Sequence, residues 1–292
     1  MWREYPVVLE GNIPMALNSV NTNVGAMVAL QSLNRTNEAL NTTQKRVSTG
    51  YRVNDAKDDG AAFAVAQSVR ADVAGLTAAN EQLGGTKGIL DTALSGLNQV
   101  SASMIKVRET LVRLADDTLN SDQRAQYEAQ YEALRTQIQN FITDATYNGR
   151  TLLSTNAPAG GDITTTRNEA GTTYTLVSVD GAGTMVVAAA PTDAASAQAA
   201  IAAGGDWGTV NTVIANALNQ YGSDSRYVDA QISYNRDKLD ALDGGLGALI
   251  DSDLAKESAR LQALQIRQQL GTQSLSIANQ APQSLLSLFR GG

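Results

Sequence analysis

The chain has 292 residues and a formal net charge of −7, and it contains neither histidine nor cysteine. Their absence removes the commonest general base, the thiolate nucleophile and every zinc site built on these two residue types. The negative charge disfavours nucleic acid and anionic membranes as partners. We therefore expect a chain that is not an enzyme and that uses no cofactor and no metal.

The first 14 residues differ in composition from the segments after them. They hold two of the five prolines and one of the two tryptophans. We interpret residues 1–14 as an extra or non-native arm before a true start at Met15. The N-terminus lacks the basic and apolar regions of a cleavable secretory signal, so any export would use another route. No run of 18 apolar residues is present, which predicts no membrane span.

Both chain ends, residues 15–54 and 251–292, have narrow apolar stripes of helical period. Polar residues such as Asn37, Gln44 and Gln268 interrupt the neighbouring rows. Helices with such thin faces are marginal alone in water. We therefore expect the two ends to pair as a terminal coiled coil that becomes ordered only against neighbouring chains. The stripe residues are Ala26, Leu33, Leu40 and Val47 in the head, and Leu254, Leu261, Leu264 and Leu275 in the tail.

Residues 55–151 and 208–250 show heptad seams, which predict a helical stem of three packed helices. Asn120, Ser121 and Asp122 can cap the second of these helices. The predicted fold class is mainly α: a long antiparallel coiled-coil stem made from both chain ends, with a small β-containing central insert. The expected stem core residues are Leu97, Met104, Leu111, Leu134, Ile138, Ile232, Leu239 and Leu242.

Residues 152–207 change sharply to Gly, Thr and Ala and predict a small variable outer segment. Within it, residues 172–190 predict two strands around an Asp180-Gly181 turn, because Gly supplies the positive φ that a hairpin needs. Residues 192–203 predict an Ala-rich helix that begins at Thr192 or Asp193.

Two further motifs favour structural interpretations over binding sites. In Asn54–Gly60, calcium ligation would require an acid where Lys57 and Ala66 stand, so a helix break before an acidic first turn fits better. The glycines of LGGTKGIL match neither phosphate-binding spacing, and they favour close helix packing or a local kink. These glycines are Gly84, Gly85 and Gly88.

Several segments resemble bacterial flagellins in the order in which that family has them. The head contains MALNSVNTN (15–23), QKRVSTGYRVNDAKDDGAAFAVA (44–66) and TYNGRTLL (146–153). The tail contains GALIDSDLAKES (247–258) and ANQAPQSLLSLF (278–289). The resemblance implies a filament subunit in which residues 15–54 and 251–292 form the inner core and 55–151 and 208–250 the surrounding stem.

The same resemblance implies an extracellular protein, exported by the flagellar type III route and polymerised into a helical tube for swimming motility. Its implied partners are copies of itself or other flagellins, an export chaperone, and the cap and hook-junction proteins. A hook–filament junction protein is the alternative, because it shares the end motifs. We assign subunit contacts to Leu33, Leu40, Val47, Arg52, Asp58, Asp59, Leu254, Leu261, Leu264, Leu275, Leu285 and Leu286.

Overall fold

The computed structural model describes residues 22–156 and 158–290, with the helix alone for 281–290. The arm expected at residues 1–14, and Met15, lie outside the described residues. The described chain forms two compact units, one from residues 22–67 together with 246–290, and one from residues 68–156 and 158–245. We call them the terminal unit and the stem unit. The predicted fold class is confirmed, since long helices from both ends accompany one small antiparallel sheet.

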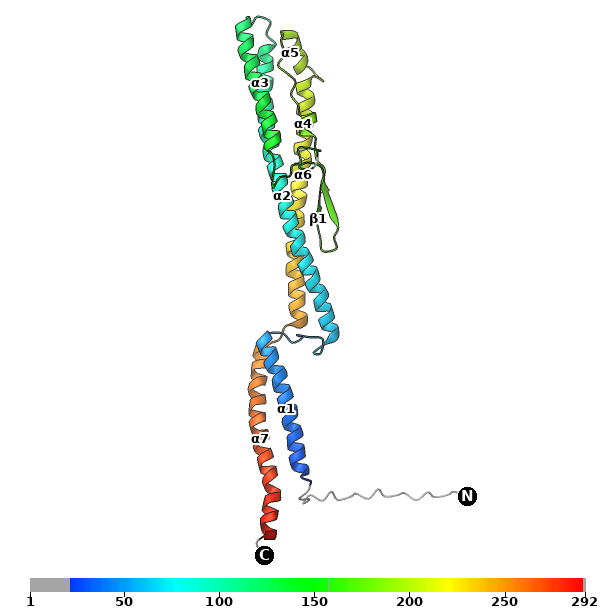
Figure 1. The fold of residues 1–292 in the computed structure, drawn as a ribbon, viewed down its shortest axis with the longest axis vertical. Coiled ribbons are helices and arrows are strands. Elements are labelled where there is room, and N and C mark those ends of the chain that lie inside the picture. The colour runs from blue at the N-terminus through cyan, green and yellow to red at the C-terminus, as the bar shows by residue number, and fades with distance from the viewer. Residues whose placement is uncertain (1–21, 157, 291–292) are drawn as a thin grey trace, which may run out of the picture. The chain divides into compact units, whose positions relative to one another are not determined.

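The terminal unit is built on α1 (Val24–Thr49) and α7 (Leu254–Arg290), which lie side by side (Figure 1). The Asn23 side chain caps α1 by accepting the Ala26 N–H. The helix ends at Gly50, whose φ of 77° is a left-handed conformation that glycine adopts without steric penalty. Contacts run from the start of one helix to the end of the other, so the pair is antiparallel.

The stem unit contains most of α2 (Gly60–Leu114) and α6 (Asp206–Ile250), together with α3 (Ser121–Asp144). The predicted cap at Asn120 is confirmed: its side chain accepts the Gln123 N–H, and Gln123 reaches back in a capping box. One apolar cluster joins the three helices, as their heptad seams predict. Its members include Leu90, Leu97, Met104, Leu111, Ile138, Ile214, Tyr221 and Val228, each at most 1% exposed.

The middle segment forms a hairpin at a different place from the one predicted. Strands β1 (Ile163–Thr166) and β2 (Thr173–Leu176) pair antiparallel, with Ile163 opposite Leu176. The hairpin expected around Asp180 and Gly181 is therefore wrong. The Asp180 carboxylate instead caps the short helix α4 (Gly181–Thr184), and the Gly181 N–H donates to the Leu153 carbonyl. The capping by Asp180 and the hydrogen bond from Gly181 to Leu153 are incompatible with the predicted hairpin turn at these two residues.

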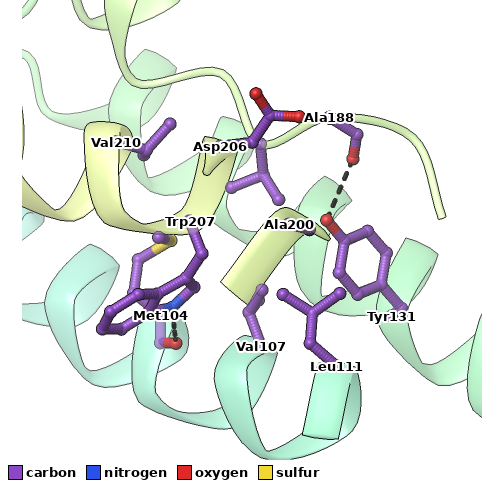
Figure 2. Close-up of a pocket in the computed structure, with 10 residues that line it drawn as sticks. Met104, Val107, Leu111, Tyr131, Ala188, Ala200, Asp206, Trp207 and Val210 are labelled. Atoms are coloured by element: carbon purple, nitrogen blue, oxygen red, sulfur yellow. Dashed lines mark hydrogen bonds between the residues drawn. The ribbon is translucent and has the colours of Figure 1, made fainter. Parts of the chain in front are cut away.

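The Ala-rich helix of the middle segment is confirmed as α5 (Ala194–Ile201), and Asp193 is its N-cap. Near it, Trp207 of α6 donates its ring N–H to the Met104 carbonyl at 2.8 Å, and Tyr131 of α3 donates to the Ala188 carbonyl at 3.2 Å (Figure 2). Burial raises the pKa of Tyr131 to about 12. The cavity between these residues has a volume of about 10 Å³, which is room for one water molecule and excludes a larger ligand.

Glycines in α2 differ in what surrounds them. A Cβ on Gly88 would lie 2.8 Å from the Tyr147 ring, which is the close packing expected, whereas Gly84 and Gly85 have nothing within 4 Å. Gly96 is more tightly enclosed, because a Cβ there would meet the Ala145 Cβ at 2.8 Å and the Phe141 carbonyl oxygen at 3.2 Å. Close approach of α2 to the end of α3 therefore depends on Gly96.

We expect Gly96→Ala to destabilise the stem by about 1–3 kcal/mol, because neither the methyl nor the backbone it meets can move freely. Gly85→Ala is the matched control in the same helix, and it should stabilise by up to about 1 kcal/mol through helix propensity. Urea unfolding followed by circular dichroism measures both. Equal stabilities of the two variants would contradict the packing described for Gly96.

Candidate subunit-contact surface

A short two-stranded joint ties the two chain ends together in the terminal unit. Tyr51 and Asp251 form an isolated antiparallel bridge, and the Ser252 N–H donates to the Gly50 carbonyl at 2.9 Å. The Arg52 guanidinium donates to the Leu249 carbonyl at 2.7 Å. Val53, Ala66 and Ile250 form a small buried cluster behind this joint. The joint therefore fixes where the head and the tail meet.

The loop after the joint is closed by its own carboxylates. Asp58 accepts the Asn54 N–H at 3.1 Å and the Lys45 ammonium at 3.2 Å. Asp55 binds the same ammonium at 2.7 Å. Asp59 accepts the N–H groups of Ala61 and Ala62 at the start of α2, so it acts as a helix cap. These three carboxylates stabilise the break between the helices, and the Lys45 ammonium bridges Asp55 and Asp58.

The seam between α1 and α7 combines few apolar contacts with polar ones. Leu40 and Leu264 are buried, at 8% and 6% exposure. Arg46 pairs with the buried carboxylate of Glu257 at 3.3 Å, and Gln268 donates to the Asn37 side chain at 2.8 Å. Polar pairs of this kind fix register more than they add stability. The seam therefore specifies the pairing while burying little apolar surface.

Large apolar side chains remain uncovered on both helices. Among those whose exposure is described, the exposed set on α1 is Val24, Met27, Val28 and Leu30, and on α7 it is Leu254, Ile266, Leu270 and Ile277. Their exposures reach 64% at Met27 and 63% at Ile277. We call these eight residues the uncovered face. Soluble monomers rarely expose so many large apolar residues on adjacent helices, and such surfaces mark interaction sites.

Comparison with known proteins identifies the family. The model of the bacterial flagellin N-terminal helical region matches residues 20–157, and that of the bacterial flagellin C-terminal helical region matches residues 208–289. The chain belongs to the bacterial flagellin family. This is a family of structural proteins and not of enzymes.

Individual flagellins align along nearly the whole chain. Flagellin FljK of Caulobacter vibrioides is 38% identical over 283 residues, covering 94% of this chain and 100% of the relative. Flagellin FljM of the same organism is 36% identical, with the same coverage. A flagellin of Brucella melitensis is 34% identical and covers 94% of this chain and 99% of the relative. The alignments with these relatives therefore extend across the middle segment as well as the two ends.

The residues assigned to subunit contacts occupy three kinds of position. Leu40 and Leu264 are buried in the α1–α7 seam, while Leu33, Val47, Leu261 and Leu275 are half-buried along it and Leu254 is exposed. Arg52, Asp58 and Asp59 organise the joint and the loop within the chain. Leu285 and Leu286 lie in α7, but their side chains are outside the described part.

Residues on the uncovered face were mostly missed from the sequence. Met27, Val28, Ile266 and Ile277 lie off the seven-residue stripe, and only their apolar character on an otherwise polar face could have revealed them. Of the expected stem core residues, the structure buries Leu97, Met104, Leu111, Leu134 and Ile138, and it places Ile232, Leu239 and Leu242 half-buried.

The described part of the chain lacks two kinds of feature. Within residues 22–156 and 158–290, no helix has both the length and the apolarity to cross a membrane. Over the same residues, no cluster of three or more His, Cys, Asp or Glu side chains is arranged to hold a metal ion.

The Asp58 carboxyl should titrate below its ordinary pKa of 3.8, because the Asn54 N–H and then the Lys45 ammonium stabilise its charged form. Its contribution to loop stability is complete above pH 3.8 and is lost as the pH falls through the lower folded value. We expect Lys45→Met to raise the pKa of Asp58, as carboxyl NMR titration can measure. Lys57→Met is the control, since it removes a neighbouring lysine that no described ion pair includes. An unchanged Asp58 titration in Lys45→Met would refute this role of Lys45.

Proposed function

We propose that this flagellin is the structural subunit of a flagellar filament, exported to the cell exterior and polymerised into a helical tube for swimming motility. The uncovered face of α1 and α7 supports the proposal, because it leaves large apolar side chains in water that a second copy of this chain can cover. The family membership and the relatives named above favour a filament subunit over a hook–filament junction protein.

The energetics of the terminal pair favour assembly-dependent ordering. Fixing a residue in a helix costs about 1–2 kcal/mol of backbone entropy. Within the described side chains of α1 and α7, only Leu40 and Leu264 are buried apolar residues. Burial of the uncovered face against neighbouring subunits supplies the missing apolar contact. Repeated contacts between different surfaces of identical chains generate a filament when the rotation between successive copies does not close a ring.

The finer partners follow from the family resemblance. We propose that an export chaperone binds the tail before secretion, that export uses the flagellar type III route, and that cap and hook-junction proteins contact the filament ends. Within the filament, the terminal coiled coil (15–54 and 251–292) would form the inner core, the stem (55–151 and 208–250) the next layer and residues 152–207 an outer segment. Mixed filaments with other flagellins fit the same surfaces.

Leu270→Asp should reduce polymer yield roughly tenfold or more, because it places an unpaired charge in the contact that buries the uncovered face. Gln269→Asp adds the same charge at the neighbouring exposed position and should have a much smaller effect. Sedimentation and electron microscopy of purified protein under assembly conditions measure both. Equal loss of polymer in the two variants would mean that the apolar character of Leu270 is not the cause.

Deleting the chain from Leu254 onward should leave a folded, soluble stem unit that does not polymerise, because α1 then has no partner helix. Circular dichroism should show helicity and a cooperative thermal transition, while electron microscopy should show no filaments. A truncated protein that still forms filaments would overturn the assignment of assembly to the terminal pair. One that fails to fold would show instead that the stem unit depends on the tail.

A further inference from the structure

The tip of the β1–β2 hairpin is held to the stem helices mainly by polar ties. The Arg167 carbonyl accepts from Asn235 at 2.9 Å and from Gln231 at 3.3 Å, both on α6. Arg167 also donates to the Tyr227 hydroxyl at 2.9 Å, and Glu169 forms an ion pair with Lys238. These groups can all exchange their partners for water. The contact of the Tyr174 ring with Tyr227, at 4.2 Å between ring centroids, is the apolar contact that opening must uncover, and the Tyr174 hydroxyl must leave Asp224.

The surface beneath the tip is itself polar and partly self-satisfied. Asn235 is fully buried on α6 at a seam position, and it donates to the Asn80 side chain at 2.9 Å. It also accepts from Gln231 at 2.9 Å. These two bonds among helix residues do not involve the hairpin and can persist when it leaves. When the hairpin leaves, Asn235 and Gln231 lose only their hydrogen bonds to the Arg167 carbonyl, and water can replace these.

The base of the hairpin is held differently. Ile163 and Leu176 are opposite each other in the sheet. Leu176 is fully buried as a member of the main apolar cluster, and Ile163 packs against that cluster. Because side chains alternate between faces along a strand, Thr165 lies on the same inner face as Ile163, nearer the tip. Opposite Thr165, Tyr174 still packs against the main apolar cluster, so the inner face of the hairpin becomes polar only beyond Tyr174, toward the tip.

Unpaired buried atoms are concentrated in the tip. Of the five buried side-chain polar atoms without a hydrogen-bond partner in the described part of the chain, three are Thr165 Oγ1, Arg167 Nε and Glu169 Oε2. A buried polar group without a partner destabilises the state that contains it. Opening would hydrate all three atoms, which favours the open state.

We propose that residues 165–173, which we call the strap, open away from α2 and α6 on a hinge at Ile163 and Leu176 while the rest of the stem unit stays folded. The strap is thus a conformational device with a local opening equilibrium of its own. Its closed state covers the amide side chains of Asn80, Gln231 and Asn235, and its open state exposes them to solvent.

Thiol labelling of the full chain tests the proposal, because the chain has no cysteine of its own. Thr165→Cys replaces a hydroxyl that has no partner, at a residue 4% exposed. Thr110→Cys is the matched control, the same substitution at a residue of α2 that is 3% exposed. We expect Cys at 165 to react on the order of 100-fold faster, with little dependence on denaturant, as local opening requires. Equal rates with equal denaturant dependence would overturn the proposal.

Two further measurements separate opening of the strap from damage by the substitution. Lys238→Met removes the ion pair to Glu169 and should raise the labelling rate at 165 roughly threefold to tenfold while leaving that at 110 unchanged. In the unsubstituted chain, the Thr166 N–H donates to the Gln82 side chain of α2 at 3.4 Å, so its amide hydrogen exchange reports separation of the strap from that helix. It should exceed the exchange of residues 97–111 by a factor comparable to the ratio of the thiol rates. Exchange of the Thr166 amide only at the rate of those helical amides would also overturn the proposal.

Discussion

The pairing of α1 with α7 is the interaction on which the terminal unit depends, and it joins residues such as Arg46 and Glu257 that are 211 positions apart. Ordering both segments has a large entropic cost, and the loop that they close is long. The joint at Gly50–Val53 and Leu249–Ser252 reduces this problem, since it holds the start of the seam in register. Beyond the joint, the seam relies on Leu40, Leu264 and polar pairs, and large apolar side chains of both helices stay exposed outside it.

The stem unit solves the same problem with a wider seam. Leu97, Met104 and Leu111 are each at most 1% exposed, and they meet residues of α3 and α6 on more than one side. In the stem unit, a third helix covers apolar side chains of the kind that stay exposed on the two helices of the terminal unit. The stem unit and the terminal pair therefore differ in the number of apolar rows that each helix buries, and the heptad pattern of the sequence already contains this difference.

The sequence predicted the fold class, the helices and two capping segments, in which the structure uses Asn120 and Asp193. These features depend on local spacing and on side chains that reach their own backbone. Sequence periodicity misplaced the hairpin, because Asp180 capped a helical turn and Gly181 bonded to Leu153, and neither contact is visible as a pattern. It also missed Met27 and Ile277, since exposure depends on where the partner helix lies. The role of Asn235 as a fully buried hydrogen-bonding centre required the hairpin to be placed first.

Unpaired buried polar atoms show where the molecule is least satisfied in this state. In the described residues they belong to Thr165, Arg167 and Glu169 of the strap, and to Arg46 and Glu257 of the terminal pair. The apolar core of α2, α3 and α6 contributes none of them. Such atoms raise the free energy of the segment that contains them and leave the apolar core unaffected. They therefore lower local stability in the strap and in the terminal pair. This distribution fits the proposal that the stem stays folded while the chain ends gain further contacts when copies of the chain assemble.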